Sequence, residues 1–309
     1  MGLPEVHDEK PGVPVSIERV GVTGVKMPIG FVYFEDKPVL VVPSFSAYIN
    51  LPATRKGIHA SRNYEIITEV LEEFAGKTYK LENVCGEIAE ELLKRHEYAT
   101  RSEVKAVGEA IVEKLTPKTG MVTYEPCTII AYAKSRKSSR GSVKTRKMVG
   151  VRVGGITACP CAQEMLRESF SKRLGLPENL KKVFEEIPWA THMQRAYGLI
   201  VTEVPEGFKI DASKLVWIVE RSMSAPNYGL LKRSDEVEIV EKAVSNPRFV
   251  EDCVRFMMKY FAESFPELPD SITVRFKQRS AETIHKHDFV AERKTTLGEI
   301  RKELGLKKT

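Results

Sequence analysis

The chain alternates between two hydrophobic periods. In some stretches apolar and polar residues alternate one by one, which predicts β-strands, and in others apolar residues recur three and four positions apart, which predicts amphipathic helices. The predicted elements of the first half are strands at 16–27 and 31–46, helices at 64–74 and 81–96, and strands at 104–115, 122–133 and 143–157. Those of the second half are strands at 197–204, 271–278 and 289–293, helices at 214–223 and 248–261, and a short C-terminal helix. The repeated order predicts a duplicated α+β unit with antiparallel sheets and helices on one face.

The duplication divides the chain into a first unit, residues 1–120, with a polar N-terminal arm, and a second unit, residues 121–309. A length of 309 residues with 42% hydrophobic residues suits two such units. No run of about 18 uninterrupted apolar residues is present, and the N-terminal segment is polar and rich in proline, so we expect a cytoplasmic protein without membrane contact. The five cysteines are expected to be thiols.

Two cysteines, Cys159 and Cys161, stand where a predicted strand ends and a helix is expected to begin. A thiolate there would lie near the backbone N–H donors at the positive end of the helix, which favours a metal ligand or a nucleophile. A second Cys-x-Cys pair is absent from the sequence. Any metal would therefore need His or carboxylate ligands from elsewhere in the chain.

Metal-binding residue types are densest just after the predicted strand at 271–278, where Glu282, His285 and His287 lie close together in the sequence. If this segment is extended, the two histidines project to the same face, and Glu282 lies on the opposite face unless the chain turns. The alternative is a loop of exposed, solvated side chains.

Two further ligand candidates lie apart from these clusters. His192 opens the predicted strand at 197–204, and Glu236 lies in a segment, 230–236, that we expect to be a loop between helices. One Cys, two or three His and a Glu with one open position form the ligand set of a catalytic divalent metal, which can generate hydroxide near neutral pH. The sequence supplies these residue types but does not show that they converge.

Cations gather before the first predicted helix, where Arg55, Lys56, His59 and Arg62 surround a glycine. Cations at a helix N-terminus favour anion binding, although the spacing differs from that of a Walker phosphate loop. The alternative is a plain basic loop. The net charge of +6 suits a polyanionic small ligand as well as nucleic acid.

A second basic segment, residues 134–147, carries seven cations and no acid. It lies on a predicted hairpin and contains no aromatic side chain on which a base could stack. We therefore expect it to be solvated or interfacial, and we regard nucleic-acid binding as the weaker interpretation.

Six motifs, in order along the chain, together resemble the type IB GTP cyclohydrolase family, and most of all its archaeal branch. They are Leu-Pro-Ala-Thr-Arg-Lys-Gly-Ile-His-Ala-Ser-Arg (51–62), Thr-Ala-Cys-Pro-Cys-Ala-Gln (157–163), Thr-His-Met-Gln-Arg (191–195), Tyr-Gly-Leu-Leu-Lys-Arg-Ser-Asp-Glu (228–236), Asn-Pro-Arg-Phe-Val-Glu-Asp (246–252) and Glu-Thr-Ile-His-Lys-His (282–287). The resemblance extends from about residue 14 to residue 295. This chain departs from the bacterial members in the segment between the second and third motifs, which is long and helical here.

The resemblance implies a bimodular tunnelling fold of two β-β-α-α-β-β units. It also implies a homo-oligomer, expected to be a tetramer, with active sites at subunit interfaces. The implied cofactor is Fe(II), with Zn or Mn able to substitute, and the implied substrate is GTP.

The resemblance further implies roles for single residues. Cys159, His192, Glu236 and His285 would surround the metal, and Glu282 would anchor the guanine edge. Two competitors stay open, Cys161 in place of Cys159 and Glu238 in place of Glu236, and His192 could instead move a proton on N7. The cations Arg55, Lys56, His59 and Arg62 are expected to bind the triphosphate.

The implied reaction opens the guanine imidazole ring of GTP, releases formate and closes a dihydropterin ring. The archaeal branch makes 7,8-dihydroneopterin 2',3'-cyclic phosphate and pyrophosphate for methanopterin biosynthesis, and the motif variants favour this product. The alternatives are the same ring chemistry giving 7,8-dihydroneopterin triphosphate for folate-type pathways, and a non-catalytic purine- or RNA-binding protein of the same fold.

Overall fold

The computed structural model describes residues 6–26, 29–34, 37–74, 77–175 and 177–306. The chain forms two compact units made of interleaved segments: unit 1 contains 1–110, 128–150 and 202–212, and unit 2 contains 111–127, 151–201 and 213–309. Four long strands contribute residues to both units: β6 (Arg101–Leu115), β7 (Val122–Lys137), β8 (Val143–Ala158) and β9 (Met193–Val204). The predicted boundary between residues 120 and 121 stays a prediction.

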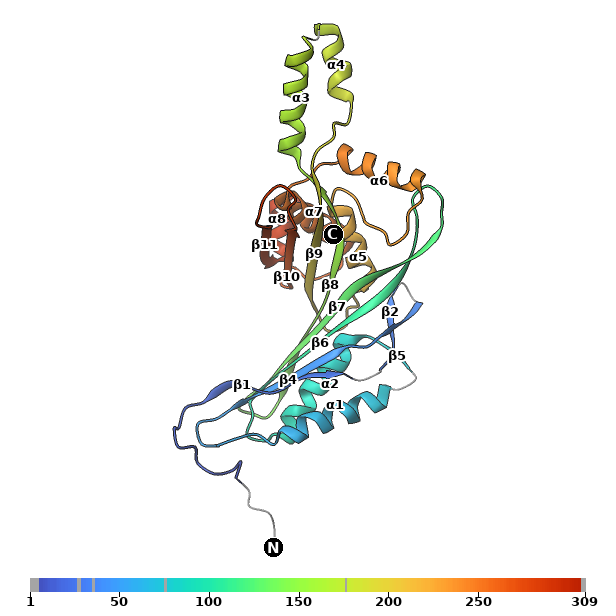
Figure 1. The fold of residues 1–309 in the computed structure, drawn as a ribbon. Helices are drawn as coiled ribbons and strands as arrows, with labels where there is room; N and C mark the ends of the chain where they lie inside the picture. Colours follow the sequence, from blue (N-terminus) through green and yellow to red (C-terminus); the bar gives the residue numbers. More distant parts are fainter. Residues whose placement is uncertain (1–5, 27–28, 35–36, 75–76, 176, 307–309) are drawn as a thin grey trace. The chain divides into compact units, whose positions relative to one another are not determined.

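Unit 1 combines a mainly antiparallel sheet with two helices. Its other elements are β1 (Ile17–Lys26), β2 (Ile29–Phe34), β3 (Lys37–Val41), β4 (Ser44–Leu51), α1 (Ala60–Phe74), β5 (Thr78–Tyr79) and α2 (Leu81–Arg95). Strand β4 pairs antiparallel with β1 and β6, and its alternate residues, among them Phe45 and Ile49, are fully buried. Helix α1 turns Ile66, Ile67, Val70 and Leu71 to the core, and α2 packs beside it (Figure 1). The predicted hydrophobic periods therefore place both helices correctly.

One predicted strand in unit 1 is wrong. The alternating segment 31–46 is not continuous, because β2 pairs antiparallel with β3 and β4 begins after a further break. Pro43 lies between β3 and β4, where its missing N–H and fixed φ suit a strand end. The N-terminal five residues of the predicted arm, and Met27 at the end of the first predicted strand, lie outside the described residues.

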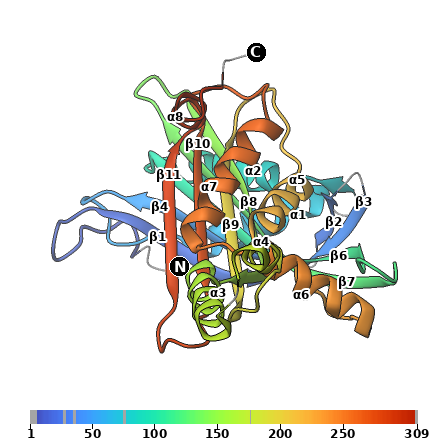
Figure 2. The same ribbon diagram turned by 90° about the horizontal axis from the view of Figure 1, so that it is seen from above.

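Unit 2 carries the remaining helices and the end of the sheet. Its further elements are α3 (Pro160–Leu174), α4 (Glu178–Glu186), α5 (Ala212–Ser222), α6 (Arg233–Ser245), α7 (Val250–Ser264), β10 (Thr273–Ser280), β11 (Phe289–Thr296) and α8 (Leu297–Glu303). The strand order is β11-β10-β9-β8-β7-β6, and α7 packs on β10 and β11 (Figure 2). Phe261, Phe265 and Phe276 form a fully buried aromatic contact between α7 and β10. None of the described helices has the length and apolar character that crossing a membrane requires.

A helical hairpin, α3–α4, leaves the sheet between β8 and β9 (Figure 1). Pro160 occupies the first turn of α3, where its missing N–H costs nothing, and Gly175 ends the helix with a φ of 57° in the left-handed region. The helical character expected between Cys161 and His192 is thus confirmed. The hairpin also explains how residues far apart in sequence meet at its base.

Candidate functional site

Cys159 lies at the junction between β8 and α3, as the sequence predicts. It is the N-cap residue of α3, and its Sγ accepts a hydrogen bond from the Ala162 N–H at 3.5 Å. The backbone of the preceding residue, Ala158, is fixed by two hydrogen bonds. The Ala158 N–H donates to Ser224 Oγ at 3.0 Å, and the Ala158 carbonyl accepts from the Arg248 N–H at 3.0 Å. A fixed backbone therefore carries the half-buried thiol beside the N–H groups that open a helix.

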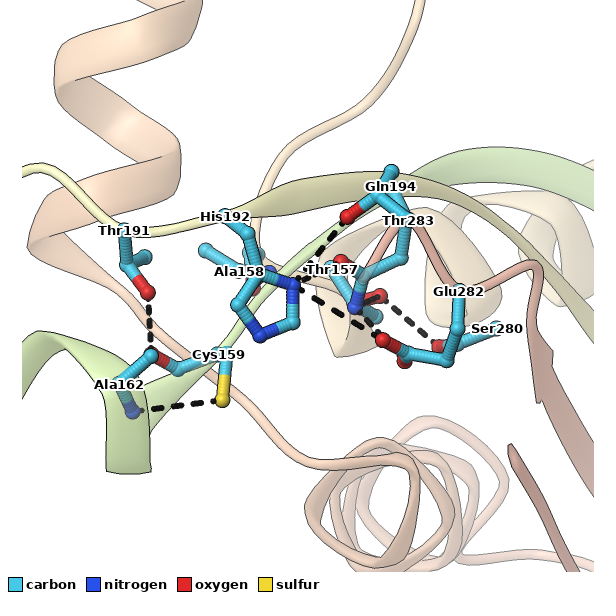
Figure 3. A network of polar contacts seen from close by, with 11 residues as sticks. Thr157, Ala158, Cys159, Ala162, Thr191, His192, Gln194, Ser280, Glu282 and Thr283 are labelled. Atoms are coloured by element: carbon cyan, nitrogen blue, oxygen red, sulfur yellow. Dashed lines mark hydrogen bonds and ion pairs between the residues drawn. The ribbon is translucent and has the colours of Figure 1, made fainter. Parts of the chain in front are cut away.

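His192 meets Cys159 across the base of the α3–α4 hairpin. The Cys159 N–H donates to the His192 carbonyl at 3.1 Å, and Thr191 Oγ1 donates to the Cys159 carbonyl at 2.8 Å. The imidazole is 16% exposed, and its Nδ1 lies 3.0 Å from Gln194 Oε1. Figure 3 shows the other ring nitrogen, Nε2, turned to the side on which Cys159 Sγ lies.

Glu282 follows β10 and has a side chain that is only 5% exposed. Its Oε1 accepts a hydrogen bond from Gln194 Nε2 at 3.1 Å, and its Oε2 lies 3.8 Å from His192 Nδ1. Among the described residues, this buried Oε2 has no hydrogen-bond partner. A buried carboxylate oxygen without a donor is costly, so the atom is suited to receive N–H groups of a ligand.

His285 lies on the loop after Glu282, which bends through residues 283–287. The segment is therefore not extended, and an extended segment is the assumption under which the two histidines are predicted to share a face. The exposed rings of His285 and His287 still lie together, with centroids 5.4 Å apart and planes at 22°, and each makes a T-shaped contact with the ring of Phe289. Of the two histidines, His285 is the one that lines the neighbouring pocket.

One pocket of unit 2, of about 230 Å³, collects these side chains. It is lined by Cys159, His192, Gln194, Arg248, Phe249, Val250, Glu251, Ser280, Glu282, His285 and Phe289. The structure thus brings together four of the predicted residues, which come from three separate motifs, namely Cys159, His192, Glu282 and His285.

The pocket also contains residues for which the sequence predicts no role. Gln194 lies within the Thr-His-Met-Gln-Arg motif, and Arg248 and Glu251 lie within Asn-Pro-Arg-Phe-Val-Glu-Asp. The available signal was their place in motifs of the resemblance. Phe249 and Phe289 supply apolar walls, which no motif of polar residues could indicate.

Glu236 and Glu238 do not line this pocket. The segment predicted as a loop enters helix α6 at Arg233, so that part of the prediction is wrong. The physical reason is the buried Asp235, which accepts hydrogen bonds from the Lys232, Lys118 and Thr119 N–H groups. Burial alone would raise the pKa of Asp235, but these bonds and one from the Thr119 hydroxyl lower it to about 2. Both glutamates are exposed on the first turns of α6.

Cys161 lies exposed in the first turn of α3, outside the lining of the pocket. Within the described part of the chain, no group of three or more His, Cys, Asp or Glu side chains is close enough to hold a metal ion. The predicted metal ligands Cys159, His192 and His285 share one pocket, and Glu236 stands apart from it. The ligand assignment stays a prediction.

The predicted anion loop, residues 55–62, follows β4 in unit 1, as expected, but its last three residues, including Arg62, form the first turn of α1, which begins at Ala60 and not after the segment. Acidic residues of the N-terminal arm approach its cations: Asp8 pairs with Arg55, and Glu9 Oε2 lies 2.8 Å from Lys56 Nζ. Asp8 also lies 3.9 Å from the ring nitrogen Nε2 of His59. In the described residues Arg62 has no ion pair, so it is the cation of this loop that is least engaged by the chain itself.

The basic segment 134–147 forms the hairpin between β7 and β8, as predicted. Several of its cations have partners within unit 1: Lys134 pairs with Glu103 at 2.8 Å, and Arg146 pairs with Glu203 at 2.6 Å. These contacts agree with a solvated surface more than with a nucleic-acid clamp.

The fold is the tunnelling fold, because urate oxidases superpose on nearly the whole chain. A uricase from Bacillus fastidious matches with a TM-score of 0.53 and 10% identity, covering 93% of this chain and 96% of that enzyme. A hyperthermostable mutant of the urate oxidase from Bacillus sp. TB-90 matches with a TM-score of 0.53 and 9% identity, covering 92% of this chain and 99% of that enzyme. These likenesses confirm the predicted α+β tunnelling fold.

The sequence places the chain within one family of this class. The profile of the type I GTP cyclohydrolase folE2 family matches residues 3–291. A Methanocella arvoryzae protein named GTP cyclohydrolase MptA 2 is 42% identical, over 99% of this chain and 100% of its own length. GTP cyclohydrolase MptA of Methanosphaera stadtmanae is 42% identical, and that of Methanocaldococcus jannaschii is 40% identical, each over 97% of both chains. The chain belongs to the type I GTP cyclohydrolase family, which confirms the resemblance found in its motifs.

Proposed function

We propose that this chain is a GTP cyclohydrolase, which opens the imidazole ring of guanine and releases formate. The observation that carries the proposal is the pocket of unit 2, in which Cys159, His192, Glu282 and His285 meet in a chain of this family. A thiol and two imidazoles can hold a metal that activates water, and a carboxylate can accept hydrogen bonds from a purine edge.

Glu282 is assigned to the guanine edge. A carboxylate can accept two parallel hydrogen bonds, and guanine presents two adjacent N–H donors, N1–H and the 2-amino group. Gln194 already holds Oε1, while Oε2 is buried without a partner among the described residues. The carboxylate is therefore positioned in advance, and an entering guanine would satisfy its remaining atom.

The ligand types in the pocket suit a divalent metal by their chemistry, and for this metal we propose Fe(II), with Zn or Mn able to substitute. Cys159, His192 and His285 would hold it, because thiolate and imidazole ligands suit these ions. A bound divalent metal acts as a Lewis acid and lowers the pKa of water. His192 turns its Nε2 to the side of Cys159 Sγ (Figure 3), where it can act either as a ligand or as the group that moves a proton on N7.

We further propose that the protein acts as a homo-oligomer, a tetramer, with active sites between subunits. Two predicted site elements support this, because the exposed Glu236 and the cation Arg62 both lie outside the lining of the pocket. In an assembly, a second chain can supply them. Glu236 is then the fourth metal ligand, and the anion loop binds the triphosphate.

The proposed product is 7,8-dihydroneopterin 2',3'-cyclic phosphate, formed with release of pyrophosphate in archaeal methanopterin biosynthesis. The MptA name of the relatives that match nearly the whole chain supports this product. The cations of the anion loop suit a leaving pyrophosphate, because they neutralise its charge.

The activity test is anaerobic incubation of the Fe(II)-loaded protein with GTP. We expect one formate per GTP, and a mass spectrum of the product that shows a single phosphate. Absence of both formate and pterin fluorescence after oxidation would refute the cyclohydrolase assignment. A product that retains three phosphates would refute the cyclic phosphate alone.

Replacing Glu282 by glutamine is expected to leave the metal content unchanged and to weaken GTP binding. Loss of a charge-assisted contact in a desolvated pocket costs about 2–4 kcal/mol, because the amide offers the guanine donors one uncharged acceptor oxygen in place of two charged ones. Metal analysis and the KM for GTP measure the two effects separately. A variant that lost its metal would show that Glu282 is a ligand instead.

Replacing Arg62 by alanine is expected to raise the KM for GTP roughly tenfold without altering the metal content, because a charge-assisted contact to phosphate is lost. The matched control is the ligand guanosine, which has no phosphates and should bind both proteins equally. Equal KM values for GTP in the two proteins would favour the plain basic loop.

A further inference from the structure

Gln194 occupies the centre of the hydrogen-bond network in the pocket (Figure 3). It is the second residue of β9 and is 7% exposed. Its side-chain oxygen lies 3.0 Å from His192 Nδ1, and its nitrogen lies 3.1 Å from both Glu282 Oε1 and Thr157 Oγ1. One amide thus contacts both His192, which is proposed to bind the metal, and Glu282, which is proposed to bind the guanine.

The neighbours of this amide determine its orientation. A carboxylate only accepts hydrogen bonds, so the amide NH₂ has to face Glu282 and the amide oxygen has to face His192. The contact with Thr157 agrees, because that hydroxyl accepts from the amide and can donate to Ser280 Oγ at 2.8 Å. No flipped arrangement satisfies the carboxylate.

This orientation in turn defines the histidine tautomer. An amide oxygen 3.0 Å from Nδ1 requires a proton on Nδ1, so the lone pair of the neutral ring is on Nε2. Nε2 is the nitrogen on the Cys159 side of the ring (Figure 3). A metal ligand and a proton acceptor both need that lone pair.

We propose that Gln194 is a positioning residue that orients His192 and Glu282 together. Its oxygen holds the Nδ1–H tautomer of His192, and its nitrogen holds Glu282 by Oε1, so that Oε2 is left for the guanine edge. The proposal rests on the proposed function, since it concerns the same pocket. It adds a residue that acts through two others and does not itself touch the reacting atoms.

A second glutamine nearby provides a matched control. Gln163 Nε2 donates to the Trp189 carbonyl at 2.6 Å and to the Val244 carbonyl at 2.7 Å. It therefore ties backbone segments together beside the same site, and its amide nitrogen is directed at these carbonyls rather than at His192 or Glu282. Its loss shows what a merely structural glutamine contributes here.

The experiment compares Gln194→Glu, Gln194→Met and Gln163→Met. A glutamate keeps an acceptor for Nδ1–H but removes the donors to Glu282 and adds a second carboxylate beside it. A methionine of similar size removes both the acceptor and the donors. Side-chain ¹⁵N NMR of the metal-free protein reports the tautomer of His192, assigned with His192→Gln. Calorimetry on the metal-free protein measures the affinity for GTP, which depends on the position of Glu282.

We expect the wild type and Gln194→Glu to show the Nδ1–H tautomer, and Gln194→Met to show a mixture of tautomers. Both Gln194 variants should bind GTP at least roughly tenfold more weakly, whereas Gln163→Met should change the Tm but neither readout. A proton on Nε2 in the wild type, or Gln194 variants that behave like Gln163→Met, would overturn the proposal. The proposed function would instead be refuted if the wild type showed the Nδ1–H tautomer and bound GTP more tightly than the Gln194 variants but released no formate.

Discussion

Replacing Cys159 by alanine is expected to remove the metal and to lower kcat/KM for GTP by roughly a thousand-fold or more. The reason is that a metal that activates water accelerates hydrolysis of the guanine ring by several powers of ten. Cys159 supplies a thiol at the junction of β8 and α3, where it lines the pocket with His192 and His285. Removal of this soft ligand takes the only thiolate out of the proposed four-ligand set and leaves His192, His285 and Glu236, so we expect the metal to be held too weakly to survive purification. Metal analysis and formate release after anaerobic loading measure both effects.

Two variants separate the metal role of Cys159 from its role as a helix cap. Cys159→Ser keeps a side-chain acceptor for the Ala162 N–H, so α3 should stay capped while the metal is still lost. Cys161→Ala alters an exposed cysteine outside the pocket lining, and we expect it to retain metal and activity. If Cys161→Ala lost the metal and Cys159→Ala kept it, the two cysteines would have exchanged roles.

The fold was largely predictable because the hydrophobic periods are clear where a single face is buried. Strand β4 alternates strictly, and helix α1 turns one stripe to the core. Prediction failed where a contact between residues far apart in the chain overrides the local hydrophobic pattern. The start of α6 depends on Asp235 and on backbone groups of Lys118 and Thr119, more than a hundred positions earlier in the chain, which no local window contains.

The site was predictable as a set of residue types, but its assembly was not. The sequence identified Cys159, His192, Glu282 and His285, and the structure places all four in one pocket. The sequence did not indicate a role for Gln194, because its role follows from the contacts of its amide with His192 and Glu282, and only the structure shows these contacts. Glu236 shows the opposite case, since its acidic motif gives no information on where the side chain projects.

A second large effect concerns folding stability, which is expected to fall by about 2–3 kcal/mol between pH 7.5 and pH 4.5 through one histidine alone. His96 is fully buried at the end of α2, where Nε2 lies 2.8 Å from Asn63 Oδ1 and Nδ1 lies 2.9 Å from the Tyr98 hydroxyl. Desolvation, followed by the nearby cations Arg62, His59 and Arg55, lowers its pKa to about 4.

The sign follows from proton linkage. In the unfolded chain the pKa of His96 returns to about 6.5, so between roughly pH 6.5 and pH 4 the unfolded state binds the additional proton. Stability is therefore complete above pH 6.5 and is lost as the pH falls toward 4, with about 1.4 kcal/mol for each unit of pKa difference. Other titratable groups also make the stability depend on pH, so the contribution of His96 has to be isolated by comparing the wild type with a variant that lacks this histidine.

The comparison is between the wild type and His96→Gln, whose side chain keeps hydrogen-bonding groups but has no proton to gain in this range. Urea unfolding at pH 7.5 and pH 4.5 gives the free energy of unfolding of each protein at each pH. The wild type should lose about 2–3 kcal/mol more than the variant over this interval, so the variant is the less pH-sensitive of the two. Parallel losses in the two proteins would mean that the pKa of His96 is the same in the folded and unfolded states. The buried contact with Asn63 would then hold the charged ring as readily as the neutral one.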